Sequence, residues 1–142
     1  MPVELGVKFR SDVSGLVTGI RFYKGVLNTG SHTGSLWSST GTLLATGTFT
    51  NETSSGWQTL TFSSPVQISA NTTYVASYHS SNGTFAVDFN YFSTHGADNT
   101  LLHALKDGVD GPNGVVLFGP GGQFPATAAN ANNFWVDVVF QH

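Results

Sequence analysis

Cysteine is absent from this chain of 142 residues, so neither a disulfide framework nor a thiolate metal site is available to it. Charged residues are also scarce, at 9% against roughly a quarter in an average globular domain. With five lysines and arginines and a net charge of −3, the chain lacks the basic patch that nucleic-acid binding requires. No apolar run approaches the roughly 20 residues of a membrane-spanning helix. We therefore expect neither nucleic acid nor a membrane among its partners.

Sustained helical periodicity is missing as well. Short apolar-alternating runs recur between turn residues instead, a pattern typical of sandwiches and barrels. We predict an all-β fold, an antiparallel β-sandwich of jelly-roll type, built as a single module over residues 1–142. The expected strands are Val3–Arg10, Val17–Lys24, Gly34–Ser38, Leu43–Phe49, Trp57–Phe62, Thr73–His79, Phe85–Tyr91, Val115–Phe118 and Phe134–Phe140. Asn82-Gly83 is a strong turn dipeptide and should join the sixth and seventh of these strands.

Uncharged polar residues and aromatics take the place of charge. Serine, threonine, asparagine and glycine keep the chain polar, while aromatic residues reach 13%, which argues against disorder. Such a composition is typical of secreted bacterial β-modules. We therefore expect a secreted or cell-surface protein, from which any signal peptide has been removed.

Two of the expected strands have faces of different character, because side chains alternate along a strand. In Phe134–Phe140, the side chains of Trp135 and Asp137 point away from the apolar set. In Val17–Lys24, Arg21 and Tyr23 do the same. If these faces belong to one sheet, they form a rigid surface with aromatic and charged groups side by side.

Such a surface suits a sugar, whose rings present apolar C–H faces and polar hydroxyls. Aromatic rings stack on the former, and charged groups hydrogen-bond the latter. Trp37 or Trp57 would add a second stacking surface. A structural alternative is that the long loop covers the aromatic side chains as a second small core, with Arg21 and Asp137 forming a structural ion pair.

Four short motifs resemble a known family. They are Arg21-Phe22-Tyr23-Lys24-Gly25, Thr33-Gly34-Ser35-Leu36-Trp37, Gly56-Trp57-Gln58 and Trp135-Val136-Asp137. In matching order from Glu4 to Phe140, they resemble the bacterial domain of unknown function 4082. The resemblance implies an accessory β-sandwich module of large secreted proteins, found beside immunoglobulin-like and carbohydrate-active domains, and brings no catalytic motif. His32 stands before the second motif as in that family, and His79 ends a tyrosine-containing strand, so we add both to the candidate ligand-binding residues.

A cluster of oxygen donors lies in the Gly- and Asn-rich stretch from Thr94 to Asn133. Asp107, Asp110 and Asn113 are candidate calcium ligands, because calcium takes six to eight oxygen ligands. The cluster does not match the EF-hand pattern, and the same residue types also simply form turns. No other cofactor is expected, since no two histidines have the compact spacing of a zinc site.

Catalysis has little support in the sequence. Only eight acidic residues are present, whereas glycoside hydrolysis needs two facing carboxylates, and no G-x-S-x-G elbow occurs. We expect a non-catalytic carbohydrate-binding accessory module of a secreted bacterial multidomain protein. Its partners would be a polysaccharide or oligosaccharide and the neighbouring domains of a larger parent chain. The alternative is a structural or protein-interaction spacer without glycan binding, in which the aromatic side chains would be covered rather than exposed.

Overall fold

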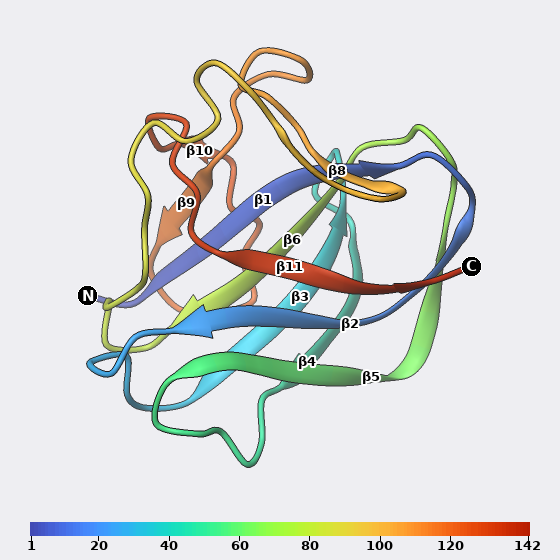
Figure 1. Cartoon of the computed structure of the whole chain (residues 1–142). Coiled ribbons are helices and arrows are strands. Elements are labelled where there is room, and N and C mark those ends of the chain that lie inside the picture. The colour runs from blue at the N-terminus through green and yellow to red at the C-terminus, as the bar shows by residue number, and fades with distance from the viewer.

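The computed structural model describes residues 1–142 and contains two antiparallel sheets that pack face to face (Figure 1). The strands are β1 (Val3–Ser11), β2 (Gly15–Lys24), β3 (His32–Ser38), β4 (Leu43–Thr48), β5 (Gly56–Ile68), β6 (Tyr74–Ser80), β7 (Ala97–Asn99), β8 (Leu102–Ala104), β9 (Val115–Phe118), β10 (Thr127–Ala128) and β11 (Val136–Gln141). The all-β antiparallel sandwich is confirmed, while the jelly-roll connectivity stays a prediction. None of these elements is a helix that could cross a bilayer.

The larger sheet has the strand order β10-β9-β1-β6-β3-β4. Strand β1 carries two partners on one edge, β9 along its first half and β8 along its second, and β7 completes a short hairpin with β8. The smaller sheet has the order β11-β2-β5 and lies in front of the larger one in Figure 1. One long edge of β11 is therefore free of strand partners, which matters for the site below.

The core lies between the two sheets and is formed by alternate residues of their strands. Phe22 of β2 is fully buried, stacks on Tyr78 of β6 at 4.2 Å between ring centroids, and meets the edge of Phe49 at 4.9 Å. Val136 of β11 is also buried. Alternation along Val17–Lys24 and Phe134–Phe140 puts both residues on the apolar faces of their strands, and the structure buries both. Because the inner face is apolar, the intervening residues of β2 and β11 must point outward.

Two expected strands differ from the structure. Residues Phe85–Tyr91 form no strand and keep only an isolated bridge between Asp88 and Asn133. Asn90 has a positive φ of 57° and Phe89 is 74% exposed, so the alternation stops before a second strand of the expected hairpin forms. The last strand begins at Val136 instead of Phe134, because Trp135 has a φ of +56°, which no extended strand accommodates.

The stretch from Thr94 to Asn133 holds more structure than its composition indicates. It contains the β7–β8 hairpin, β9 and the two-residue β10, although only β9 was expected. Strand β5 also continues past Pro65 to Ile68. Proline is tolerated there because β5 is the edge of its sheet, where a missing N–H leaves no ladder bond unmade.

Candidate functional site

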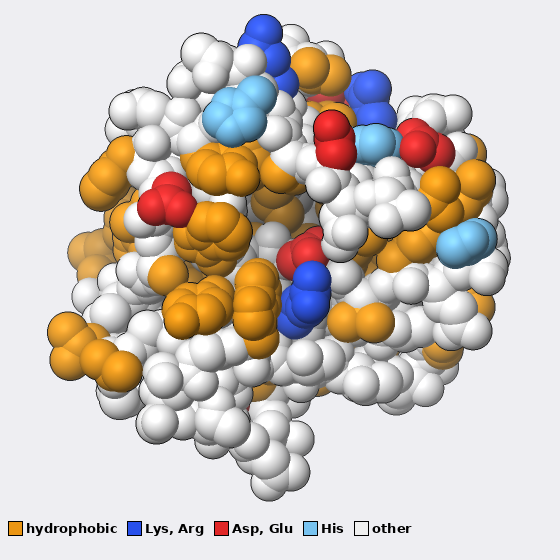
Figure 2. Space-filling view, in the orientation of Figure 1, with side chains coloured by type: hydrophobic (Ala, Val, Ile, Leu, Met, Phe, Trp, Pro, Cys, Tyr) orange, Lys and Arg blue, Asp and Glu red, His pale blue; other side chains and the backbone are white.

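The outward face of the smaller sheet brings together five of the residues singled out in the sequence. We call this set, Arg21, Tyr23, Trp57, Trp135 and Asp137, the platform. Figure 2 shows hydrophobic side chains gathered beside an adjoining acidic and basic pair on this face. Tyr23 is 44% exposed and Trp57 45%. No loop buries these two rings, so the covered arrangement considered from the sequence does not apply to them.

Strand register sets the spacing within the platform. Arg21 of β2 is opposite Asp137 of β11, and Tyr23 is opposite Trp57 of β5. The rings of Tyr23 and Trp57 meet edge to face with centroids 5.7 Å apart, an arrangement that aromatic quadrupoles favour. The pair thus forms a stiff ledge with each ring partly open to solvent.

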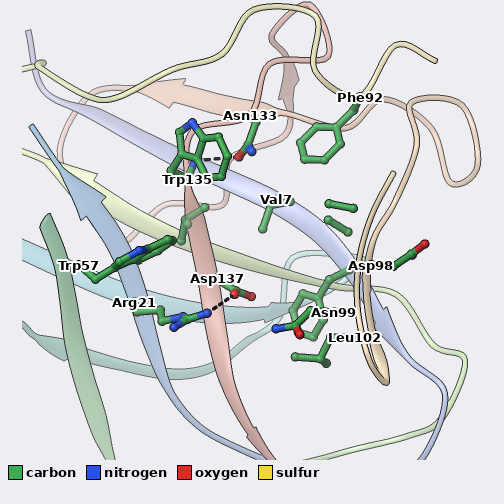
Figure 3. Close-up of a pocket in the computed structure, with 14 residues that line it drawn as sticks. Val7, Arg21, Trp57, Phe92, Asp98, Asn99, Leu102, Asn133, Trp135 and Asp137 are labelled. Atoms are coloured by element: carbon green, nitrogen blue, oxygen red, sulfur yellow. Dashed lines mark hydrogen bonds and ion pairs between the residues drawn. The ribbon is translucent and has the colours of Figure 1, made fainter. Parts of the chain in front are cut away.

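Arg21 is held from two sides at the centre of the platform. Its Nη2 lies 3.0 Å from Oδ2 of Asp137, and its Cζ lies 4.8 Å from the centroid of the Trp57 ring (Figure 3). Both charged side chains are 37% exposed. A pair this open to water contributes at most about 1 kcal/mol to stability. Its main effect is to orient the guanidinium and the carboxylate on the surface.

Trp135 is fixed in a backbone conformation that its own side chain disfavours. Its φ of +56° lies in the left-handed region, where a non-glycine residue costs roughly 1–3 kcal/mol. The backbone N–H donates to Oδ1 of Asn133 at 2.8 Å, and the carbonyl accepts from the N–H of Tyr23 at 2.9 Å. The indole N–H donates to Oδ2 of Asp88 at 3.1 Å. These contacts hold the ring beside the platform, and strain of this kind clusters at functional sites.

A hollow of about 170 Å³ adjoins the platform on the free side of β11 (Figure 3). Arg21, Trp57, Trp135 and Asp137 line one side, and Asp98, Asn99 and Leu102 of the β7–β8 hairpin line the other. Val7 of β1 also lines it. The hairpin residues could not be predicted, because two strands of three residues each leave no periodic signal in the sequence. Asp88 was visible only as an acidic residue inside a strand that does not form.

Three of the candidate ligand-binding residues lie away from the platform, so their predicted role was wrong. Trp37 is 3% exposed on the outer face of the larger sheet, where its indole N–H donates to Oγ of Ser77 at 2.9 Å. It packs against Phe124 at 5.5 Å between centroids. Because a ligand cannot reach the ring, Trp37 offers no second stacking surface.

The two histidines are likewise structural. His32 is 1% exposed, with Nε2 2.6 Å from Oδ1 of Asn28 and Nδ1 2.9 Å from Oε1 of Glu52. His79 is 9% exposed and its Nε2 lies 2.9 Å from the carbonyl of Gly119. Neither contributes to the platform.

The residues of the candidate calcium loop form polar contacts with one another and with β1. Asn113 is 1% exposed, and its amide makes four hydrogen bonds, to the N–H groups of Lys8 and Gly114 and to the carbonyls of Lys8 and Leu105. Asp107 accepts from the N–H of Asn113 at 2.8 Å. Asp110 lies 3.6 Å from Arg10, and its carbonyl accepts from Nζ of Lys8.

This donor set does not fit a calcium ion. Asp110 has Arg10 beside its carboxylate and Lys8 Nζ at its carbonyl, and the buried amide oxygen of Asn113 already accepts two hydrogen bonds. Elsewhere in the chain, no three His, Cys, Asp or Glu side chains converge as metal ligands would. The loop is a structural turn whose polar groups are matched within the chain.

Glu4, on the larger sheet, is the most perturbed titratable group near neutral pH. It is 1% exposed, and its Oε2 accepts from Oγ of Ser77 at 2.6 Å, while Oε1 has no partner. Burial raises the pKa of this carboxyl to about 7, against the opposing effect of the Ser77 hydrogen bond. Because Ser77 also bonds buried Trp37, this group belongs to packing and lies apart from the platform.

Fold and surface together define an antiparallel β-sandwich module with an exposed aromatic platform on its smaller sheet. Residues 1–136 match the family described as Domain of unknown function (DUF4082), and the chain belongs to this family. Comparison with curated proteins and with solved structures found no match.

Proposed function

We propose that the protein is a non-catalytic carbohydrate-binding module that holds a polysaccharide or oligosaccharide on the platform. The observation that carries this proposal is the exposure of Tyr23 and Trp57 beside the ion pair of Arg21 and Asp137. A spacer without a ligand has no use for two large aromatic rings open to water on a rigid sheet. Exposed apolar patches of this kind mark binding surfaces.

The platform supplies both kinds of contact that a sugar ring needs. Arg21 lies over one face of the Trp57 ring, and the exposed remainder of Trp57 and Tyr23 offers stacking area for C–H groups. Arg21 uses Nη2 for its ion pair and its Nε is buried without a partner, which leaves Nη1 as the donor group for hydroxyl oxygens. Asp137 accepts from Val138 N–H through Oδ1 and from Arg21 through Oδ2, and each oxygen has a second lone pair for a sugar hydroxyl.

The carboxylates beside the platform support binding instead of hydrolysis. Asp88 accepts from the Trp135 indole, and Asp137 is held by Arg21 and by the N–H of its neighbour Val138. Glycoside hydrolysis needs two carboxyl groups that face each other across the scissile bond, whereas each of these two is bonded to a different group of the chain. Both groups are therefore suited to positioning and hydrogen bonding.

We place the module in a secreted or cell-surface protein of bacteria, beside other domains of a larger chain. This setting is supported by the family resemblance and by the low charge and polar character of the sequence. In such a setting the module would keep its parent chain at a glycan surface.

The proposal is tested by titrating intrinsic tryptophan fluorescence with soluble plant, fungal and bacterial polysaccharides, together with pull-down on insoluble ones. Wild-type binding is expected with a Kd on the order of micromolar to millimolar. Trp57→Ala should lose about 1–3 kcal/mol of affinity with little change in melting temperature. Phe118→Ala is the matched control, because Phe118 is 59% exposed on the larger sheet. Absence of binding across the panel would refute the proposal.

A second function, protein interaction, is favoured by one different observation. Phe89 and Phe118 are 74% and 59% exposed and line an apolar hollow of about 670 Å³. This surface suits a neighbouring domain of the parent chain. If the glycan panel is silent while Phe118→Ser weakens association with an adjacent domain, the spacer function replaces the carbohydrate-binding one.

A further inference from the structure

Three hollows are linked by shared lining residues, from Tyr23 and Trp57 at one end to Phe140 of β11 at the other. The first, of about 440 Å³, is lined by Tyr23, Trp57, Asp88 and Trp135, with Ala86 and Val87. It shares Trp57 and Trp135 with the hollow described above. That central hollow shares Arg21, Asn99 and Leu102 with a third, of about 390 Å³, which continues to Phe140. We call the three together the β11 groove.

The shape of the β11 groove follows from sheet topology. Because β11 has a strand partner on one side only, its free edge leaves a channel between itself and the β7–β8 hairpin. Figure 3 shows Arg21 and Asp137 on one side of this channel and Asn99 and Leu102 on the other. Strand β11 has six residues and extends about 20 Å at roughly 3.3 Å per residue. A channel of that length is much longer than one sugar ring.

Charge along the β11 groove is predominantly negative. Asp88, Asp98 and Asp137 line it, against a single arginine that is already paired with Asp137. His103 bonds Asp98 at 2.6 Å and Asp12 at 2.8 Å, so any positive charge on it is offset twice. A ligand rich in carboxylates or sulfates would meet like charges here, which lowers its affinity.

On these grounds we propose that the β11 groove binds the interior of a linear, uncharged glycan chain, an inference that rests on the proposed function of the platform. One sugar unit stacks on the ledge of Tyr23 and Trp57, the next lies over Arg21 and Asp137, and following units continue past Asn99 toward Phe140. The ligand is thus defined by its extended shape and its lack of charge. A chain end or a compact monosaccharide would fill only one of the three hollows.

An extended peptide adding to the free edge of β11 is the competing occupant. The structure disfavours it, because the side chain of Asp137 already accepts the N–H of Val138 at 2.8 Å. Strand addition needs such edge N–H groups to be free for the incoming chain. A glycan makes no such demand, because it uses side-chain faces and hydroxyl partners.

The test is isothermal titration with two kinds of ligand. The first is a series of neutral linear oligosaccharides, from monosaccharide to hexasaccharide, of the polysaccharide backbone that binds best. The second is a polyuronate, titrated at about 0.15 M salt, where charges farther apart than about 8 Å are screened. Affinity should rise at least tenfold from disaccharide to hexasaccharide, and the polyuronate should bind more weakly than the neutral polymer. Asn99→Ala, an exposed residue between two hollows, should lower hexasaccharide affinity about threefold or more and leave disaccharide affinity unchanged. Thr61→Ala, exposed on the same sheet but outside the groove, should change neither.

The outcomes separate this inference from the proposed function. If no glycan binds at all, the platform proposal fails and the groove proposal with it. If glycans bind through Trp57 but affinity stops rising at the disaccharide and Asn99→Ala is silent, the platform stands and the groove proposal is overturned. Equal or tighter binding of the polyuronate overturns the charge selection. If an extended peptide pairs with β11 and displaces no glycan, the groove proposal is also overturned.

Discussion

The Trp135 indole N–H and the Asp88 carboxylate meet at 3.1 Å, although 47 residues separate them in the sequence. Two backbone hydrogen bonds join the same two segments, because Asp88 and Asn133 each donate an N–H to the carbonyl of the other, at 2.9 and 3.0 Å. A segment without strand structure therefore holds the aromatic ring that ends the platform. The platform depends on this link as well as on the register of β2, β5 and β11.

Removing the Asp88 carboxylate should weaken glycan binding more than it weakens folding. Asp88→Ala deletes the acceptor of the indole N–H, so Trp135 loses one of its three fixed contacts. We expect a loss of about 1 kcal/mol in affinity, roughly fivefold, with a smaller change in unfolding free energy because the side chain is exposed. Asp88→Asn keeps an oxygen acceptor and should restore most of the affinity. Equal losses for both variants in fluorescence titration would contradict a positioning role.

The positive φ of Trp135 predicts an inverted ranking of two small substitutions. Alanine normally stabilises a chain relative to glycine, by about 0.5–1 kcal/mol. At a φ of +56°, alanine retains the clash of its Cβ while glycine does not. We expect Trp135→Gly to be more stable than Trp135→Ala by about 1 kcal/mol in urea unfolding. The reverse order would show that the residue is not left-handed in solution.

Glu4 makes stability depend on pH near neutrality. Its pKa is raised from 4.5 to about 7 in the folded state by burial, so between these values the folded chain holds a proton that the unfolded chain has lost. The unfolding free energy should therefore fall as pH rises from about 4.5 to about 7, by up to about 3 kcal/mol, and level off above that. Urea melts at several pH values measure it.

Two variants isolate the contribution of Glu4. Glu4→Gln cannot ionise, so its unfolding free energy should be nearly flat over this range and should exceed that of the wild type at pH 8. His103 also has a raised pKa, because its hydrogen bonds to Asp12 and Asp98 favour the charged form, and its stabilisation is lost as pH rises through that value. His103→Gln should retain the decline below pH 6.5, which separates the two groups. If the unfolding free energy of Glu4→Gln falls with pH as steeply as that of the wild type, the pH dependence arises from another group.

The sequence was sufficient for the sandwich and for most of the platform, because both follow from period-two alternation. Arg21, Tyr23 and Asp137 were placed correctly on one outer face, since Ile20, Phe22, Val136 and Val138 fix the inner face of the same strands. Trp57 followed by the same rule. Trp135 lies beside the platform for a different reason than alternation, because it adopts a left-handed conformation just before β11 begins.

Residues that depend on long-range pairing were beyond prediction. Trp37 alternates like Trp57, but the segment around Phe124 covers it, and no local pattern reveals which outer face a loop will cover. The β7–β8 hairpin pairs with β1 across more than 90 residues, so its place beside the platform depends on topology. Asn113 looked like a ligand by type, and only its four partners show that it is structural.

Phe22 should be among the most costly positions to truncate. It is fully buried and contacts Tyr78, Phe49 and His32 with its ring. Phe22→Ala should cost about 3–5 kcal/mol through lost burial and the cavity left behind. Lys106→Ala, at an exposed loop position, should cost less than about 0.5 kcal/mol. Equal effects in denaturant melts would contradict the assignment of the inner face.

Asn113 should stabilise the fold without any metal. Its amide joins the loop to β1 through four hydrogen bonds in a buried position, and removal of a buried partner leaves donors and acceptors unsatisfied at about 1–3 kcal/mol each. Asn113→Ala should therefore lower the unfolding free energy by at least about 2 kcal/mol.

A bound calcium ion would raise the melting temperature by linkage. Because the charged groups of Lys8 and Arg10 both contact Asp110, we expect identical melts in millimolar calcium and in chelator, for the wild type and for Asp107→Ala and Asp110→Ala. A calcium-dependent rise that both aspartate variants abolish would establish the cation site after all.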